Sequence, residues 1–293
     1  MSSLNVIAQH RRLVIINADD FGISSDVNQA IIQAHTQGVL TSTSLMVTGD
    51  AAEEAIALAR NHPNLAIGLH LVLVCGRSVL PVSQIPHLVD SQGNFPDSPV
   101  LAGLRYQFHP AARAELRREI RAQLQKFSDS GLPLSHVDGH LHLHVHPVVM
   151  RILAELAPEF KIRVIRLPSE ELGINLKLNR QDLLTKLVWS GVFGALRRYG
   201  EGLLTSEGIG FANRVYGLLQ TGNMSEEYLL GLIPQIQADL VEIYSHPSLL
   251  NNGETELAAL LSEQVRDVLV INGFELTNYA KAGCLKSDLA SGK

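Results

Sequence analysis

The chain has 293 residues, of which 46% are hydrophobic and 18% are charged. This balance excludes a mainly disordered protein, and the length allows one domain of α/β barrel size or two smaller domains. A net charge of −5 argues against a nucleic-acid partner held by lysine and arginine.

The sequence has few features that would indicate an oxidising compartment, secretion or a membrane span. Two cysteines, Cys75 and Cys284, are too few for a disulfide framework or a cysteine zinc site, which fits a reducing compartment. Residues 1–10 lack the apolar core of a signal peptide, and no window reaches about 18 uninterrupted apolar residues. We therefore predict a cytoplasmic protein without a membrane span.

The first strand is predicted over residues 13–16, a short β-branched run typical of a parallel strand that is buried on both faces. Two adjacent acids, Asp19 and Asp20, follow it directly. Ligands collect at the carboxyl ends of parallel strands, so these acids are candidates for chemistry. Alternatively, one of them caps the helix predicted over 26–37.

A second strand over 41–48 and a helix over 50–60 lead to an apolar run over 65–74 that contains a single histidine, His70. A lone histidine in such a strand is more often a hydrogen-bonded core residue. The order strand, helix, strand would nevertheless bring His70 beside the two acids. The Pro- and Gly-rich segment 75–110 is then expected to be an irregular insertion, either a substrate wall or a mobile surface loop.

Histidine occurs at every second position after a helix predicted over 111–130. If this stretch is extended, one face carries His136, Asp138, His140, His142, His144 and His146, and the other is apolar. Imidazole is the commonest metal ligand in proteins, so the pattern predicts a metal centre. The alternative is a set of hydrogen-bonded or solvated histidines near a loop.

The second half of the chain continues the alternation of helices and strands. A helix over 148–156 precedes a strand over 161–167, where Arg166 faces either the site or solvent. The segment 180–222 is expected to be an apolar and basic helical insertion. It could contact a hydrophobic substrate or a membrane surface, or it could pack on the core like an ordinary helix.

The last predicted strand with a chemical group at its end covers 239–247 and ends in His246. Helices over 225–237 and 262–272, a short strand over 274–279 and a loose tail over 286–293 complete the predicted elements.

The polar groups at the predicted strand ends form a possible catalytic set. A catalytic divalent ion needs about three protein ligands and an open position for water. One carboxylate and two imidazoles supply them, a second carboxylate can accept the proton of the water, and a histidine can protonate the leaving group. This set predicts hydrolysis of an acyl or a phosphoryl bond, between which the spacing does not choose.

Four motifs in this order resemble those of the YdjC family of carbohydrate deacetylases, the ChbG/HpnK group: Asn17-Ala18-Asp19-Asp20-Phe21-Gly22, Gly68-Leu69-His70, the alternating histidines after His136, and Ser245-His246-Pro247. The resemblance implies an α/β fold, a distorted (β/α) barrel like that of polysaccharide deacetylases. It also implies one deacetylase domain over 1–293, with its core at 12–280.

The same resemblance implies metal-dependent removal of an acetyl group from an N-acetylated sugar. Asp20, His70 and His140 would hold the ion, either Mg²⁺ or Zn²⁺, and Asp19 would be the base. His246 is the expected proton donor and His144 its rival. We assign Arg166, His142 and Asp138 to substrate binding.

Within the family, the hopanoid-biosynthesis branch is the most similar, through segments such as Gly68-Leu69-His70-Leu71-Val72-Leu73-Val74, Val79-Leu80-Pro81 and Arg166-Leu167-Pro168. This branch implies a lipid-linked N-acetylglucosaminyl substrate. The stretch Asp138-Gly139-His140-Leu141-His142 is closer to the chitooligosaccharide branch.

A chitooligosaccharide is therefore the second candidate substrate. Two further functions fit the same residues: a different metal hydrolase, for example of phosphoesters, and a non-catalytic metal- or sugar-binding module. Peripheral membrane contact and a homodimer are both compatible with the sequence.

Overall fold

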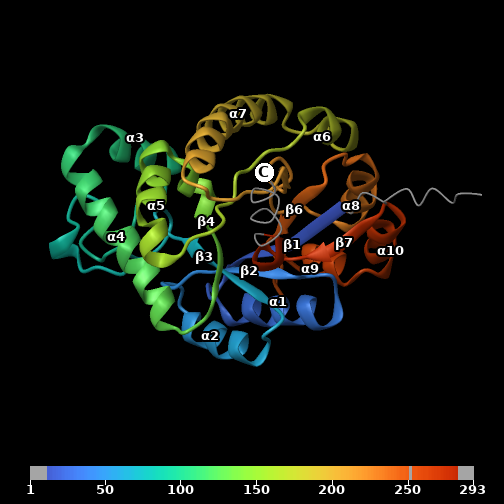
Figure 1. The fold of residues 1–293 in the computed structure, drawn as a ribbon, viewed down its shortest axis with the longest axis horizontal. Helices are drawn as coiled ribbons and strands as arrows, with labels where there is room; N and C mark the ends of the chain where they lie inside the picture. Colours follow the sequence, from blue (N-terminus) through green and yellow to red (C-terminus); the bar gives the residue numbers. More distant parts are fainter. Residues whose placement is uncertain (1–11, 251–252, 283–293) are drawn as a thin grey trace, which may run out of the picture.

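The structure is a computed structural model that describes residues 12–250 and 253–282. Its strands are β1 (Arg12–Phe21), β2 (Ser42–Leu45), β3 (Ala66–Leu71), β4 (Leu134–Gly139), β5 (Arg214–Tyr216), β6 (Leu240–Ser245) and β7 (Phe274–Thr277). All strand pairs are parallel, in the order β4-β3-β2-β1-β6-β5, and β7 pairs with the start of β1. The sheet curls into an open barrel with helices outside it (Figure 1). The predicted distorted (β/α) barrel is confirmed.

Helices connect the strands, as parallel pairing requires. They are α1 (Ser25–Gln37), α2 (Ala52–Asn61), α3 (Pro99–Phe108), α4 (Pro110–Asp129), α5 (Pro147–Phe160), α6 (Leu172–Leu178), α7 (Leu183–Ser206), α8 (Glu226–Leu232), α9 (Gly253–Leu261) and α10 (Glu263–Ile271), with short 3₁₀ turns η1 (Val82–Gln84), η2 (His140–Val145) and η3 (Ile233–Gln235). Within the described ranges, none of these helices has the length and apolar character to cross a membrane.

Helix α4 shows why these segments become helical. Leu116, Ile120, Leu124 and Phe127 recur at intervals of three or four residues and are all buried, so one stripe of the helix packs on the core. Pro110 occupies the first turn, where its missing N–H leaves no hydrogen bond unmade.

Helix α3 corrects the expectation that 75–110 is irregular. Ser98 caps this helix by accepting from the N–H of Leu101, and Pro99 begins it. Ala102 and Tyr106, four residues apart, are buried. The apolar stripe is short, and this is why periodicity alone did not indicate the helix.

The predicted strand over 161–167 is also corrected. It forms only isolated bridges, Val137 with Ile165 and Val164 with Gly210, and Pro168 follows without an N–H to extend the pairing. The predicted helices over 26–37, 50–60 and 262–272 are confirmed within two residues at each end. The tail over 286–293 lies outside the described residues.

The alternating histidines do not form one extended face. Strand β4 ends at Gly139, and η2 follows with Leu141 and His142 in left-handed conformations at φ 48° and 56°. The turn sends successive histidines in different directions, whereas an extended strand would have aligned them. The predicted single wall of imidazoles is therefore wrong.

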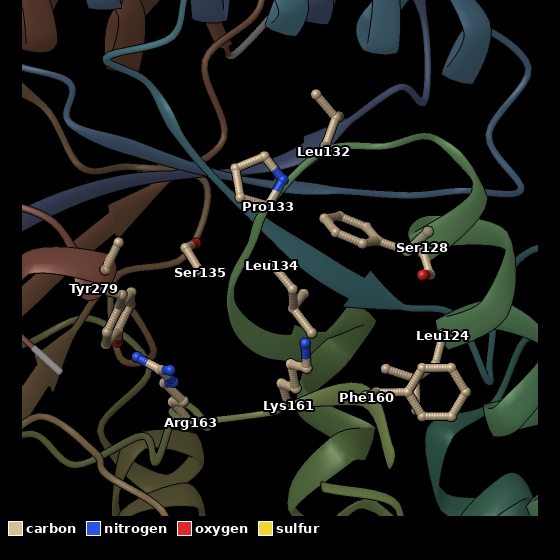
Figure 2. A pocket seen from close by; sticks show the side chains of 12 residues that line it. Leu124, Ser128, Leu132, Pro133, Leu134, Ser135, Phe160, Lys161, Arg163 and Tyr279 are labelled. Carbon is tan, nitrogen blue, oxygen red and sulfur yellow. The ribbon is translucent and has the colours of Figure 1, made fainter. Parts of the chain in front are cut away.

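A cavity of about 350 Å³ lies at the amino end of β4, between α4 and α5 (Figure 2). Its polar lining includes Ser135, Lys161, Arg163 and Tyr279, and the described residues that line it include no carboxylate or histidine. This cavity therefore offers no ligand set for a divalent ion. The groups of interest lie at the opposite ends of the strands.

Candidate active site

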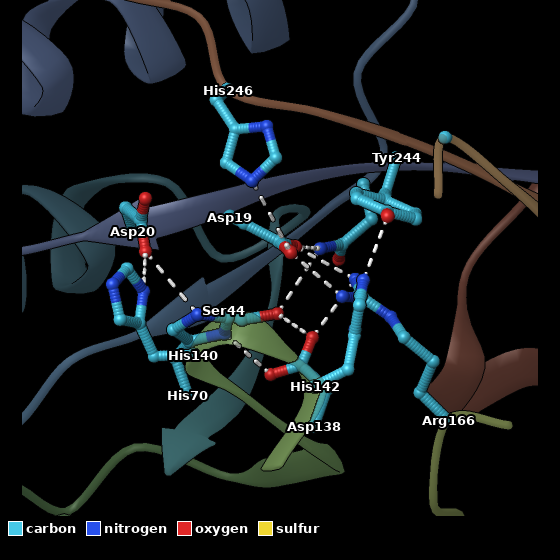
Figure 3. Close-up of polar contacts among 12 residues, drawn as sticks. Asp19, Asp20, Ser44, His70, Asp138, His140, His142, Arg166, Tyr244 and His246 are labelled. Carbon is cyan, nitrogen blue, oxygen red and sulfur yellow. Dashed lines mark hydrogen bonds and ion pairs between the residues drawn. The ribbon is translucent and has the colours of Figure 1, made fainter. Parts of the chain in front are cut away.

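Asp20, His70 and His140 converge at the carboxyl ends of β1 and β3 and the start of η2 (Figure 3). One oxygen of Asp20 lies 3.2 Å from Nε2 of His70 and 3.0 Å from Nδ1 of His140. The three potential ligand atoms lie within 4.8 Å of one another. One carboxylate and two imidazoles fit a catalytic divalent ion that keeps an open position.

A local irregularity of β1 brings both adjacent acids to the site. In a regular strand Asp19 and Asp20 would point to opposite faces. Here the pairing with β2 shifts register between Ala18 and Phe21, and Asp20 adopts a left-handed conformation with φ 65°. The strained backbone therefore serves the geometry of the site.

The potential ligand atoms of a second triple, Asp19, His70 and Asp138, also lie within 4.8 Å of one another. Arg166 already contacts both of its carboxylates, at 2.7 Å from Asp19 and 2.8 Å from Asp138. The fixed guanidinium charge would repel a second cation there. The chemistry of the donor set therefore favours the triple that contains Asp20 and His140.

Asp138 lies behind His70 and accepts from its Nδ1 at 2.8 Å, while Ser44 donates to the other carboxylate oxygen at 2.6 Å. This arrangement aims Nε2 of His70 at the ligand position. Burial alone would lower the pKa of His70, but Asp138 and Asp20 raise it to about 10.

Asp19 is held firmly but still lines the site. Both of its oxygens accept from Arg166 at 2.7 Å, and Asn17 donates to one of them at 2.9 Å. Each carboxylate oxygen has two lone pairs, so these bonds leave room for a water. Arg166 also bonds Glu242, and it is fully buried.

The two proton-donor candidates have different surroundings. His246 lines the active-site cavity, is partly exposed, and has its Nε2 3.9 Å from Asp19. His144 is fully buried, its Nε2 lies 3.0 Å from the carbonyl of Arg166, and burial lowers its pKa to about 4. His144 does not line the cavity.

The three residues predicted to bind substrate also differ in their surroundings. His142 lines the cavity, and its Nε2 lies 2.7 Å from the hydroxyl of Tyr244. Arg166 and Asp138 are fully buried and do not line the cavity, so their contacts are with other charged side chains of the site. Direct contact of either residue with a substrate stays a prediction.

Several members of this network were not predicted from the sequence: Ser44, Glu242, Tyr244 and Asn17. The sequence feature that could have indicated them is a polar residue inside an apolar strand, such as Glu242 between Val241 and Ile243 of β6. A fully buried acid needs a partner, and here Arg166 and Tyr279 provide it.

Comparison with known proteins shows the family of this chain. A family model described as YdjC-like protein matches residues 13–270. The chain belongs to the YdjC family. This family member is 34% identical over 272 residues to a carbohydrate deacetylase of Brevibacillus brevis, covering 91% of this chain and 93% of the relative. A carbohydrate deacetylase of Vibrio cholerae is 31% identical over 278 residues, with 91% and 95% covered.

A solved structure from Enterococcus faecalis, named as a candidate cellobiose-phosphate cleavage protein, has the same fold as this YdjC-family chain. It superposes with a TM-score of 0.70 at 25% identity, covering 93% of this chain and 99% of that one.

Proposed function

We propose that this protein is a divalent-metal-dependent hydrolase that removes the acetyl group from an N-acetylated amino sugar. The observation that carries the proposal is the convergence of Asp20, His70 and His140 beside Asp19 and His246 on one cavity. Its relatives along nine tenths of the chain are carbohydrate deacetylases. A spare acid beside the ligand set supports catalysis over metal storage.

A divalent ion held by Asp20, His70 and His140 would supply Lewis acidity, which polarises a carbonyl oxygen and lowers the pKa of water. Asp19, oriented by Arg166, accepts the proton of the attacking water. The oxygen of that water forms a bond to the acetyl carbon, and the C–N bond breaks. His246 gives a proton to the departing nitrogen, so acetate and an amino sugar leave.

The favoured substrate is a lipid-linked N-acetylglucosaminyl group of the hopanoid type, and the alternative is a chitooligosaccharide. The active-site cavity has a volume of about 560 Å³, and much of its wall is apolar: Val100, Leu104, Phe108, Leu141, Leu143, Val145, Trp189, Val192, Phe193, Leu196 and Leu218. An apolar wall beside a polar floor suits a sugar joined to a hydrophobic group.

The test measures metal content and acetate release in matched variants. Asp20→Ala and His140→Ala are expected to lose metal and activity together. Asp19→Asn should keep metal and lose turnover by at least about a hundredfold, since general-base catalysis contributes typically 10²–10⁴-fold. Asp50→Asn, at an exposed position, serves as the control.

Full activity of Asp19→Asn would refute the assigned base. A comparison of His246→Ala with His144→Ala separates the proton donors, because the proposal expects only the former to lose turnover without losing stability. Acetate release from an N-acetylglucosaminyl lipid and from a chitooligosaccharide ranks the two substrates.

A further inference from the structure

Two helices beside the active-site cavity expose an unusual amount of apolar surface. On α3 the exposed side chains are Val100, Leu101, Leu104 and Phe108, and on α7 they are Leu183, Leu184, Leu187, Val188, Trp189 and Val192. Phe108 is 74% exposed and Leu184 is 76% exposed. Single exposed apolar residues are ordinary, but a concentration of this size marks an interaction surface.

The first half of α7 has the reverse of the usual helix pattern. A surface helix normally buries its leucines and exposes its lysines. Here Lys186 is buried and donates to the carbonyl of Asn179, while Leu184, Leu187 and Val188 around it are exposed. Nothing in the described part of the chain covers these side chains, so they are free to contact another surface.

The apolar surface is continuous with the mouth of the cavity. Six side chains are both exposed and part of the cavity lining, and they therefore form its rim: Val100, Leu104, Phe108, Leu141, Trp189 and Val192. Leu184 and Val188 precede Val192 at intervals of four residues, on the same helical stripe. Figure 1 shows α3 and α7 along one edge of the molecule.

Exposed cations outnumber exposed acids on and beside these helices. Residues 98–114 contain Arg105 and Arg113 and no acid. Residues 172–200 contain one acid, Asp182, and three exposed cations, Lys177, Arg180 and Arg198. Two further cations in this range, Lys186 and Arg197, are buried, and Arg197 pairs with Glu201. In a protein of net charge −5, such a local excess of cations beside apolar side chains fits an anionic lipid surface.

We infer that α3 and α7 dock this protein on an anionic lipid bilayer, with the cavity mouth facing the membrane. Apolar side chains would enter the interface while Lys177, Arg180 and Arg198 meet anionic headgroups. The inference rests on the proposed function for its purpose, since a lipid-linked sugar would then enter without leaving the bilayer. Its structural support is independent of that function.

The experiment is sedimentation of the full-length protein with vesicles of phosphatidylglycerol and phosphatidylcholine. Leu184→Gln/Val188→Gln changes two exposed side chains outside the cavity lining, and glutamine keeps the helix propensity. The matched control is Val270→Gln/Ile271→Gln on α10, where the two side chains are 68% and 81% exposed.

We expect the wild type and the α10 control to bind the anionic vesicles. The α7 variant should bind at least about tenfold more weakly, because it lacks two apolar side chains that the bilayer would bury. Lys177→Gln/Arg180→Gln should reduce binding and its salt dependence. Acetate release from a soluble chitooligosaccharide should be unchanged in all these variants.

Wild-type protein that stays in solution with anionic vesicles would overturn the docking inference, as would equal binding of the α7 variant. A dimer that the α7 variant dissociates in analytical ultracentrifugation, without vesicle binding, would assign the surface to a second copy instead. Failure of deacetylation with intact vesicle binding would contradict the proposed function alone.

Discussion

Arg166 compensates the charge of three buried carboxylates. Its guanidinium contacts Asp19, Asp138 and Glu242, and all four side chains are at most 2% exposed. Although burial alone would raise it, Arg166 and His70 hold the pKa of Asp138 well below its ordinary value. Breaking such a network by removing one partner leaves uncompensated buried charge.

Arg166→Met should therefore lower the free energy of unfolding by about 3–5 kcal/mol. Arg163→Met provides the control, because Arg163 is exposed and a surface change is expected to stay within about 0.5 kcal/mol. Urea denaturation of the two variants measures the difference. Equal stability of both would show that the carboxylates do not depend on this guanidinium.

Glu170 is a second residue whose ionised form lowers the stability of the folded state. It accepts from the backbone N–H groups of Gly217 and Leu219, and burial raises its pKa from 4.5 to about 7. Since its folded-state pKa exceeds the unfolded value, the native state binds more protons between these pH values. Its contribution to stability is present at low pH and is lost as the pH rises from about 4.5 to 7.

Glu170→Gln keeps an oxygen that can accept the two N–H bonds and removes the charge. We expect this variant to be more stable than wild type at pH 8, by on the order of 1–3 kcal/mol, and to match it near pH 4. Denaturation at the two pH values measures this change. Glu207→Gln, at an exposed position, should show no such difference, and a destabilised Glu170→Gln at pH 8 would contradict the prediction.

At the scale of elements, turns decide where side chains point. Helix α5 ends at Phe160, and the next residue, Lys161, adopts a left-handed conformation with φ 56° and ψ 39°. This is the position where helices usually place glycine, because a Cβ is unfavourable in that conformation. The exposed lysine therefore stores backbone strain at the end of the helix.

Lys161→Gly should raise the free energy of unfolding by about 0.5–1 kcal/mol, because it relieves this strain. Lys126→Gly tests the reverse case, since Lys126 is exposed in the last turn of α4, where a right-handed helical residue is replaced by glycine at a cost of up to about 1 kcal/mol. Thermal or urea denaturation compares the two. Destabilisation of similar size in both variants would contradict the assignment of strain to Lys161.

At the scale of the whole molecule, the candidate metal centre links distant parts of the chain. Asp20 ends β1, His70 lies in β3 and His140 begins η2, so unfolding separates all three ligands. An ion that binds only the folded state stabilises it by mass action, by about 2.7 kcal/mol at a hundredfold excess over Kd.

We therefore expect Zn²⁺ or Mg²⁺ to raise the melting temperature of the wild type by several degrees and a chelator to reverse the shift. His140→Ala should abolish the response. Differential scanning fluorimetry with each ion separately measures it and ranks the two metals. The same shift in His140→Ala would place the bound ion elsewhere.

The sequence by itself predicted most of the strands and helices, though not α3 or β5, and most of the candidate groups. Buried parallel strands read as continuous apolar runs, and polar residues after them meet at one end of the sheet. For that reason Asp19, Asp20, His70 and His246 could be proposed as one site before the fold was known.

Only the tertiary structure decided how each group is used. The turn after Gly139 directs His140 to the ligand set and buries His144, because left-handed residues break the alternation that a sequence pattern assumes. From the sequence alone, Arg166 is interpreted as a surface residue or a substrate contact. The fold instead surrounds it with three carboxylates that are remote in sequence. Long-range packing and charge compensation set these roles, and neither is encoded in local periodicity.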